Sequence, residues 1–237
     1  ENGAGKSTLI KTLCGEYKPD SGEIYFEGKK LNITSTRNAI EQKICAVYQE
    51  LSLVPELTIA ENLFLGFYDT NAIGRVDYKD LEKRTLELFK KYDVDPINPK
   101  TKVKILPLAQ KQVLEILKAL NRDGDIIIFD EPTAVLVPKE IEELLKTLKY
   151  LSGLGKSIII ITHKLQEVMD VADRAVIMRK GRYVGERRIE DTTIKELSYL
   201  MVGRGIPPRE IEERKPGKAV LEVENLTFSK DGVSVLK

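Results

Sequence analysis

Two short, almost uninterrupted apolar runs constrain the fold more than any other feature of the chain. They are Ile126–Phe129 and Ile158–Ile161. Runs of this length and composition are typical of parallel strands that are buried on both faces of a sheet. Between them, apolar residues recur at helical spacing, at Ile141, Leu144, Leu145, Leu148 and Leu151. The strand–helix–strand order predicts an α/β protein with a mostly parallel sheet.

The N-terminal half carries further strand and helix signals. A turn over 19–22 precedes a short strand over 23–28, and residues 44–48 form another strand. Residues from about 58 to 120 are mostly helical in pattern. Within them, one amphipathic helix has its apolar face on Val113, Ile116, Leu117 and Leu120.

The character of the sequence changes near its C-terminus. Residues 203–218 hold three prolines among alternating charges and are expected to form a surface linker. Beyond them, apolar residues alternate with glutamates, which predicts a strand over Leu221–Phe228. This strand either hangs free, which is the favoured interpretation, or packs on the preceding domain.

Composition excludes several classes of protein. The chain has 38 Lys and Arg against 37 Asp and Glu, so its charge gives no reason to expect a nucleic-acid partner. Its longest apolar stretches are too short to cross a bilayer. Cys14 and Cys45 lack metal-ligand spacing and are expected to be reduced.

A glycine-rich loop opens the chain and leads into a helix. The loop comprises Asn2, Gly3, Ala4, Gly5, Lys6, Ser7 and Thr8, which match the end of the phosphate-binding pattern G-x-x-x-x-G-K-[ST]. The leading glycine of that pattern would precede Glu1, so we expect a fragment that begins inside the motif. Glycine lets the backbone N–H groups approach phosphate oxygens, Lys6 supplies a positive charge, and the Ser7 hydroxyl can bind Mg²⁺. The alternative is an ordinary glycine-containing loop before a helix.

Polar residues follow three of the expected strands and complete the candidate site. Asp130 and Glu131 end the Ile126–Phe129 strand, where Asp130 can hold Mg²⁺ and Glu131 can face an attacking water. His163, the single histidine, follows the next strand and is expected to contact the γ-phosphate of a nucleotide. Gln49 follows the 44–48 strand, where its amide oxygen can reach Mg²⁺ or the water. Taken singly, each could instead be an ordinary polar residue at a strand end.

The ordered set of motifs resembles the ATP-binding cassette family. Asn2–Thr8 is similar to its P-loop, Val47–Glu50 to its glutamine loop, Asp130–Thr133 to its acidic strand end, and Thr162–Lys164 to its histidine switch. The resemblance covers residues 1 to about 202. It implies a P-loop NTPase fold with a RecA-like, mostly parallel sheet, an inserted α-helical subdomain over about 58–120 and a partial antiparallel β-subdomain.

The family resemblance also implies roles for individual residues. Cassettes of this family form dimers that hold two ATP molecules, with Mg²⁺, between them. Glu131 would then be the general base, and His163 would sense the γ-phosphate. The loop that signals between the two sites would comprise Ala134, Val135, Leu136 and Val137.

A narrower resemblance is to the tandem-cassette ATPases of monosaccharide importers. It rests on Tyr48–Pro55, Asp130–Leu136 and Met201–Arg204. In such proteins one polypeptide holds two cassettes, and Val220–Leu226 is similar to the first strand of the second. The resemblance implies that 1–202 is a first cassette lacking its initial strands and that 219–237 begins a second one.

One motif departs from the family pattern. The family's signature, roughly L-S-x-G-Q, corresponds here to Leu106, Pro107, Leu108, Ala109 and Gln110. In the family this motif touches the γ-phosphate of the ATP bound to the opposite cassette. Pro107 suits the first turn of a helix but offers neither a hydroxyl nor an N–H. We therefore expect unequal sites, with the site that uses Glu131 being the hydrolytic one.

The expected function is ATP hydrolysis that drives import of a simple sugar. The partners implied are a second cassette, membrane permease subunits docked near 50–66 and, indirectly, a periplasmic or extracellular solute-binding protein. The location implied is the cytoplasmic face of the cell membrane. The alternatives are a nucleoside importer, a cassette ATPase acting on ribosomes or in DNA repair, and an ATP-gated module with impaired hydrolysis. The isolated fragment is expected to hydrolyse ATP weakly or not at all.

Overall fold

The computed structural model describes residues 3–68, 76–203, 217, 221–230 and 233–236. The chain divides into two units, Glu1–Gly205 and Ile206–Lys237, which are described separately below.

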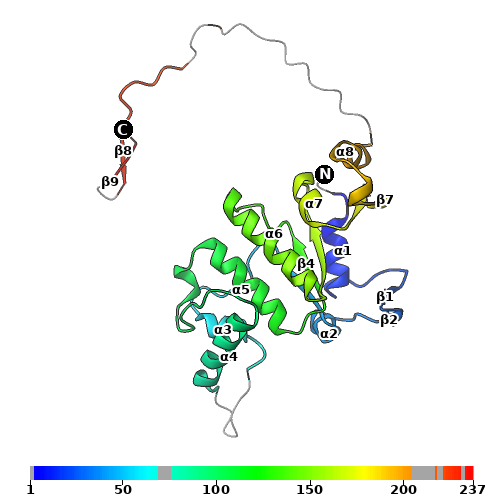
Figure 1. Ribbon diagram of the computed structural model, residues 1–237, viewed down its shortest axis with the longest axis horizontal. Helices are drawn as coiled ribbons and strands as arrows, with labels where there is room; N and C mark the ends of the chain where they lie inside the picture. The colour runs from blue at the N-terminus through cyan, green and yellow to red at the C-terminus, as the bar shows by residue number, and fades with distance from the viewer. Residues whose placement is uncertain (1–2, 69–75, 204–216, 218–220, 231–232, 237) are drawn as a thin grey trace. The chain divides into compact units, whose positions relative to one another are not determined.

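A three-stranded parallel sheet forms the centre of the first unit (Figure 1). Its strands are β3 (Ile44–Val47), β4 (Ile126–Asp130) and β5 (Ser157–Ile161), in that order across the sheet. All three predicted strands are confirmed to within one or two residues. Because the strands are parallel, the residues that follow them emerge at one edge of the sheet.

Helices cover both faces of this sheet. Alternate residues of β4 face opposite clusters: Ile127 packs in the larger one and Ile128 in the smaller one. The larger cluster is built from α3 (Ile59–Leu63), α4 (Tyr78–Lys91), α5 (Leu108–Asn121) and α6 (Pro138–Gly153). The smaller cluster is built from α1 (Lys6–Leu13) and α2 (Thr36–Glu41).

The predicted helical region is confirmed in part. Its helices are α3, α4 and α5, with a short 3-10 helix, η1 (Val103–Ile105), before α5. A capping box fixes the start of α3: the Thr58 hydroxyl accepts a hydrogen bond from the Glu61 N–H, and the Glu61 carboxylate accepts one from the Thr58 N–H. The segment between α4 and η1 is irregular, so the region is less uniformly helical than its pattern indicates.

Antiparallel hairpins and the remaining helices complete this unit. The predicted strand over 23–28 is shorter than expected, because Glu27 and Gly28 both adopt positive φ and turn the chain into a partner strand. The elements are β1 (Ile24–Phe26), β2 (Lys29–Leu31), α7 (Leu165–Val171), β6 (Arg174–Arg179), β7 (Arg182–Arg188), η2 (Ile189–Asp191) and α8 (Ile194–Val202).

The second unit contains one hairpin, β8 (Phe228–Lys230) with β9 (Val233–Leu236), among its described residues. The strand expected over Leu221–Phe228 is wrong, since only Phe228 lies in a strand. Leu221 is 80% exposed, and among the described residues no strand pairs with the backbone N–H and carbonyl groups of 221–227. Most of the predicted linker over 203–218 lies outside the described residues. The assignment of 219–237 to a second cassette stays a prediction.

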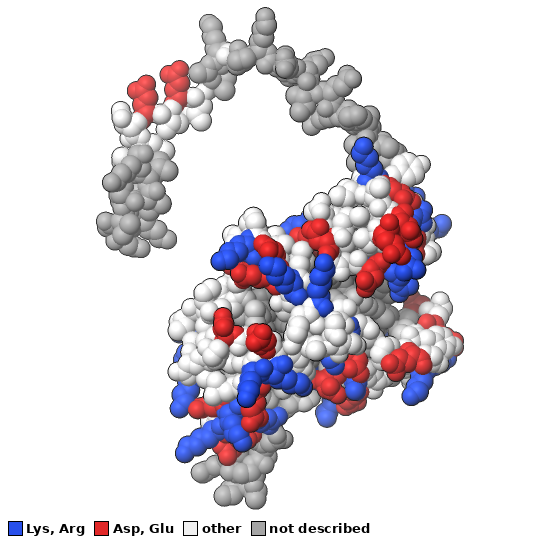
Figure 2. Space-filling view, in the orientation of Figure 1, with Lys and Arg blue, Asp and Glu red and all other residues white. Residues whose placement is uncertain are grey.

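The visible surface mixes charges of both signs rather than gathering one of them (Figure 2). Cys14 and Cys45 are buried and free. In the part of the chain that the structure describes, no helix combines the length and apolar character needed to cross a membrane.

Candidate nucleotide site

The glycine-rich loop is held against the turn of the β6–β7 hairpin. The Gly181 N–H donates to the Ala4 carbonyl at 3.1 Å. Gly5 has a φ of 92°, and a Cβ there would lie 3.2 Å from the Gly181 Cα. A side chain at Gly5 would therefore be both strained and crowded. Gly181 is not among the predicted site residues, although Lys180-Gly181 between two charged segments is a hairpin-turn signal.

Helix α1 begins directly after this loop and carries the rest of the motif. Gly5 is its N-cap and provides no side-chain cap, and no acidic residue occupies the first turn. The N-terminal N–H groups and the positive end of the helix dipole therefore favour an anion. Ser7 and Thr8 are exposed in this first turn. Asn2, also predicted here, lies outside the described residues.

Asp130, at the end of β4, lies within electrostatic reach of the loop. Burial raises the pKa of its carboxyl, and the neighbouring Glu131 raises it further, while the positive charge of Lys6 opposes both effects. The charge of Lys6 therefore acts on the carboxyl at the end of β4, and a shared site for the loop and Asp130 stays a prediction. Asp130 and the Ser7 hydroxyl are hard oxygen donors, which fit Mg²⁺ completed by water and phosphate. No group of three His, Cys, Asp or Glu suited to a metal occurs among the described residues, so a protein-only metal cage does not form there.

Glu131 and His163, from the ends of neighbouring strands, contact one another. Nδ1 of His163 lies 3.1 Å from Oε1 of Glu131, with side-chain exposures of 59% and 23%. Glu131 adopts a φ of 47°, which is unusual for a residue with a side chain. Its N–H donates to the Ile161 carbonyl at 2.8 Å, which joins the turn after β4 to β5. The Glu131 carboxylate and the His163 imidazole are thus held together at this edge of the sheet, and the predicted role of Glu131 as general base stays a prediction.

The other predicted site residues lie near this edge or on α5. Gln49 follows β3 and is exposed, and so is Pro107. The signature residues lie at a helix start, as predicted, because α5 begins at Leu108 and Pro107 is its N-cap. The remaining signature residues are Leu106, which is buried, Ala109, which is half-buried, and Leu108 and Gln110, which are exposed.

The loop predicted to signal between sites begins three residues after Glu131. Val135 and Val137 are 61% and 56% exposed, and Ala134 is exposed as well. Leu136 packs against the larger core cluster and anchors the loop. Within one cassette this exposure leaves two apolar side chains available for a partner.

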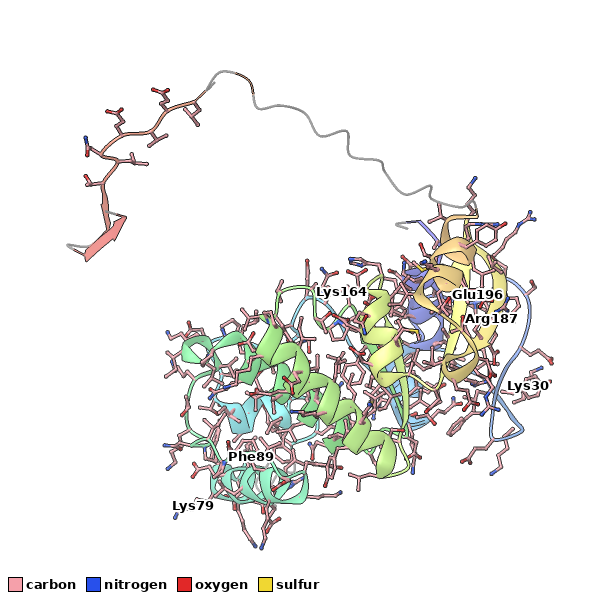
Figure 3. The ribbon with its side chains drawn as sticks, turned by 45° about the horizontal axis from the view of Figure 1, so that its top comes forward. Lys30, Lys79, Phe89, Lys164, Arg187 and Glu196 are labelled. Atoms are coloured by element: carbon pink, nitrogen blue, oxygen red, sulfur yellow. The ribbon has the colours of Figure 1, made fainter. Side chains whose placement is uncertain are left out.

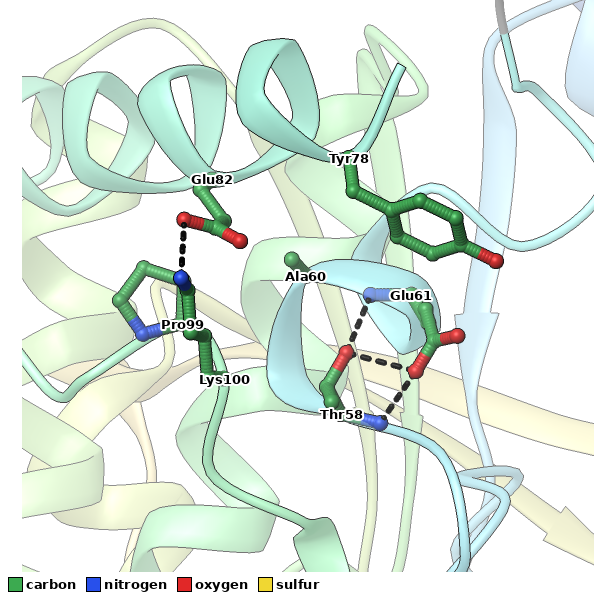
Figure 4. Close-up of a pocket in the computed structure, with 7 residues that line it drawn as sticks. All are labelled: Thr58, Ala60, Glu61, Tyr78, Glu82, Pro99 and Lys100. Carbon is green, nitrogen blue, oxygen red and sulfur yellow. Dashed lines mark hydrogen bonds and ion pairs between the residues drawn. The ribbon is translucent and has the colours of Figure 1, made fainter. Parts of the chain in front are cut away.

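A separate cavity of about 100 Å³ lies between α3 and α4 (Figure 4). None of the predicted site residues lines it. Lys100 pairs with Glu82 at 3.4 Å across its rim, and the α3 capping box occupies its floor. The residues lining it are Thr58, Ala60, Glu61, Tyr78, Glu82, Pro99 and Lys100.

Comparison with known sequences agrees with the motifs. The ABC transporter family model matches residues 1–134. The chain is 40% identical to a putative ribose/galactose/methyl galactoside import ATP-binding protein of Burkholderia lata, over 98% of this chain and 44% of that protein. It is 40% identical to the galactose/methyl galactoside import ATP-binding protein MglA of Yersinia pestis, over 96% of this chain and 45% of the relative. The chain therefore spans less than half the length of these relatives.

Solved structures agree with the fold. The ATP-binding cassette MJ1267 of an ABC transporter, in its ADP conformation, matches with a TM-score of 0.71 at 25% identity, over 86% of this chain and 85% of that one. The cbiO1 protein of Clostridium perfringens, part of an ABC transporter complex, matches with a TM-score of 0.67 at 26% identity, over 85% and 78%. The predicted P-loop NTPase fold is thus confirmed. The chain belongs to the ABC transporter family, as one of its ATP-binding cassettes.

Proposed function

We propose that this chain is the first cassette of an ATPase that powers import of a simple sugar through a separate membrane permease. The observation that carries the proposal is the contact between Glu131 and His163 at one sheet edge, next to Asp130, whose carboxyl is influenced by the charge of Lys6. The names of the relatives support a sugar as the solute.

Each residue of the site has a role in this proposal. The N–H groups and charge of Gly3–Thr8 bind the β- and γ-phosphates. Ser7, Asp130 and Gln49 would hold Mg²⁺, which would neutralise charge on the phosphates. Glu131 takes a proton from the water that attacks the γ-phosphate. The His163 imidazole contacts an oxygen of the γ-phosphate.

The proposal includes partners outside this chain. A second cassette in the same polypeptide would supply an intact signature motif to the ATP site that contains Glu131. Leu106–Gln110 would contribute to the second ATP site and would bind its γ-phosphate less tightly. The exposed Val135 and Val137 suit contact with that second cassette. Permease subunits would dock near 50–66 at the cytoplasmic face of the membrane, with a solute-binding protein outside.

A second candidate is an ATP-gated module that closes on nucleotide without turnover. Pro107 favours this candidate, because it lacks the backbone N–H that another residue at this position could donate to a phosphate. Glu131 in contact with His163 favours hydrolysis instead.

Transport and hydrolysis by the full-length protein test the proposal together. Cells lacking the parent gene are supplied with the wild type or with Lys6→Ala, and uptake of labelled ribose, galactose and a nucleoside is measured. We expect the wild type alone to restore sugar uptake, and the purified wild type to hydrolyse ATP. Restored nucleoside uptake would identify the other solute class, and binding of ATP without hydrolysis would favour the gated module.

A further inference from the structure

A buried carboxylate lies behind the candidate site and joins its two loops. Glu167 of α7 is 6% exposed. It accepts hydrogen bonds from the Thr133 hydroxyl at 2.8 Å and from the Thr162 hydroxyl at 3.3 Å. Thr133 lies in the loop after β4, and Thr162 in the loop after β5. One carboxylate therefore bridges the segments that carry Glu131 and His163.

Lys164 completes the bridge from the N-cap of α7 (Figure 3). Its Nζ pairs with Glu167 at 3.2 Å and donates to the Thr133 carbonyl at 2.9 Å. Its backbone N–H donates to the Thr162 hydroxyl at 3.0 Å. We call Thr133, Thr162, Lys164 and Glu167 the loop clamp. The partly exposed Lys164 ammonium forms an ion pair with the buried Glu167 carboxylate, and a buried charge needs such a partner.

The clamp adjoins a residue of the site that has a left-handed backbone. Glu131, two positions before Thr133, keeps its left-handed backbone at a φ of 47°. Such conformations persist only where the surroundings fix them, and they are frequent at functional sites. From the opposite side, the Gln112 amide of α5 donates to the Pro132 carbonyl. The turn after β4 is therefore held between α5 and the clamp.

We propose that Glu167, acting with Lys164, is a positioning residue that fixes the Glu131 carboxylate against His163. Its effect on hydrolysis rests on the proposed function, whereas its effect on the Glu131–His163 contact does not. If the loop clamp only stabilised the fold, substitutions in it would leave the Glu131–His163 contact unchanged.

The nucleotide-free chain offers a direct probe, because His163 is its single histidine. In protein purified without a histidine tag, the imidazole ¹H–¹⁵N signals at one fixed pH report the Nδ1 contact. Glu131→Gln defines the signal of the altered contact. We expect Glu167→Gln to move the signal in the same direction. We expect Asp170→Asn, at an exposed acid of the same helix, to leave it in place.

The full-length protein supplies a second readout. Small misplacements of a catalytic group cost up to about a hundredfold in rate. We expect Glu167→Gln to lower kcat roughly tenfold to a hundredfold while the KM for ATP changes less than about twofold. Thr133→Val removes one hydroxyl of the clamp and is expected to act in the same direction, more weakly; it replaces Glu167→Gln if that variant fails to fold.

Unmoved imidazole signals in a folded variant of Glu167 or Thr133, judged by circular dichroism, would overturn the proposal. So would a raised KM with unchanged kcat. If the wild type does not hydrolyse ATP, the proposed function fails while the imidazole signals still decide the role of Glu167.

Discussion

Nδ1 of His163 lies 3.1 Å from Oε1 of Glu131, so two residues separated by a strand and a helix in the sequence share one hydrogen bond. The carboxylate gives the ring an acceptor for an Nδ1 proton. That arrangement fixes the ring orientation and leaves Nε2 as the atom that can face a phosphate. The two residues are therefore expected to act as a unit.

Replacing the imidazole tests this coupling. We expect His163→Ala, in the full-length protein, to lower kcat for ATP about a hundredfold or more, because it removes a γ-phosphate contact and the partner of Glu131. ATP affinity should fall less than tenfold. Kinetics together with equilibrium nucleotide binding measure both. A loss confined to binding would contradict the coupling.

The Asp130 carboxylate is expected to lower the stability of the fold while contributing to Mg²⁺ binding. Burial, then the charge of Glu131, raises its pKa in the folded chain, so between pH 3.8 and the folded pKa the folded state binds more protons than the unfolded state. Stability should therefore fall as pH rises from 3.8 through the folded pKa and stay lower above it. Asp130→Asn should raise the melting temperature at pH 7 by about 1–3 °C while weakening Mg²⁺-dependent ATP binding.

Asp125, at the other end of β4, is the matched control. A hydrogen bond from Lys156, and another from Lys43, lower the pKa of its carboxyl. Its contribution to stability is present above pH 3.8 and is lost as pH falls through the folded pKa. Asp125→Asn should lower the melting temperature at pH 7. Shifts of the same sign for both variants would contradict this electrostatic account.

Pro107 is expected to limit the second ATP site. It stands at the N-cap of α5 with extended backbone angles that serine adopts readily, and it provides no side-chain cap. Pro107→Ser would add a hydroxyl and an N–H, and a hydrogen bond to a charged group is worth roughly 1.5–3 kcal/mol. ATP-driven closure of the full-length protein should tighten about tenfold, measured by nucleotide trapping. Ile105→Ser, at a residue 69% exposed, is the control and should change nothing.

A second buried network ties the segment after Gln49 to α5. The Ser52 hydroxyl donates to Glu115 at 3.0 Å, and Lys118 donates to the same hydroxyl at 2.9 Å, with Glu115 and Lys118 each 5% exposed. Removing one partner of a buried charged network costs roughly 3–5 kcal/mol. We expect Glu115→Ala to lower the free energy of unfolding by about that amount in urea titrations.

Lys118→Met is expected to cost less, because Glu115 keeps the hydrogen bonds that the Ser52 N–H and hydroxyl donate to it. Burial lowers the pKa of the Lys118 ammonium, so its charge is already unfavourable in the fold. Methionine keeps the apolar stem and removes that charge. Glu87→Ala, at an exposed residue of α4, should stay within about 0.5 kcal/mol of wild type. Equal losses in the free energy of unfolding for Glu115→Ala and Lys118→Met would contradict the expectation that Glu115 stabilises the fold more than the Lys118 charge does.

The parallel sheet and the main site residues could be predicted because their signals are local. Ile126–Phe129 and Ile158–Ile161 are continuous apolar runs, and the carboxyl ends of parallel strands share one edge, which places Asp130 and His163 together. Helix α5 was equally visible in its periodic apolar face.

Long-range contacts account for what the sequence could not reveal. The packing of Gly181 on Ala4 and the bridge made by Glu167 join segments far apart in the chain, and neither carries a local pattern. The alternation at Leu221 and Val223 predicted a strand, but alternation alone supplies no partner strand. Glu131 gave no sign of its left-handed backbone, since that conformation is imposed by its neighbours.

We propose above that Glu131 is the general base of an ATP-hydrolysing cassette. The most direct test is the steady-state ATPase rate of the full-length protein carrying Glu131→Gln, with MgATP affinity measured in parallel. The account predicts that hydrolysis falls by about a hundredfold or more while affinity is retained or increased. Hydrolysis at the wild-type rate by a variant that still binds MgATP would contradict it.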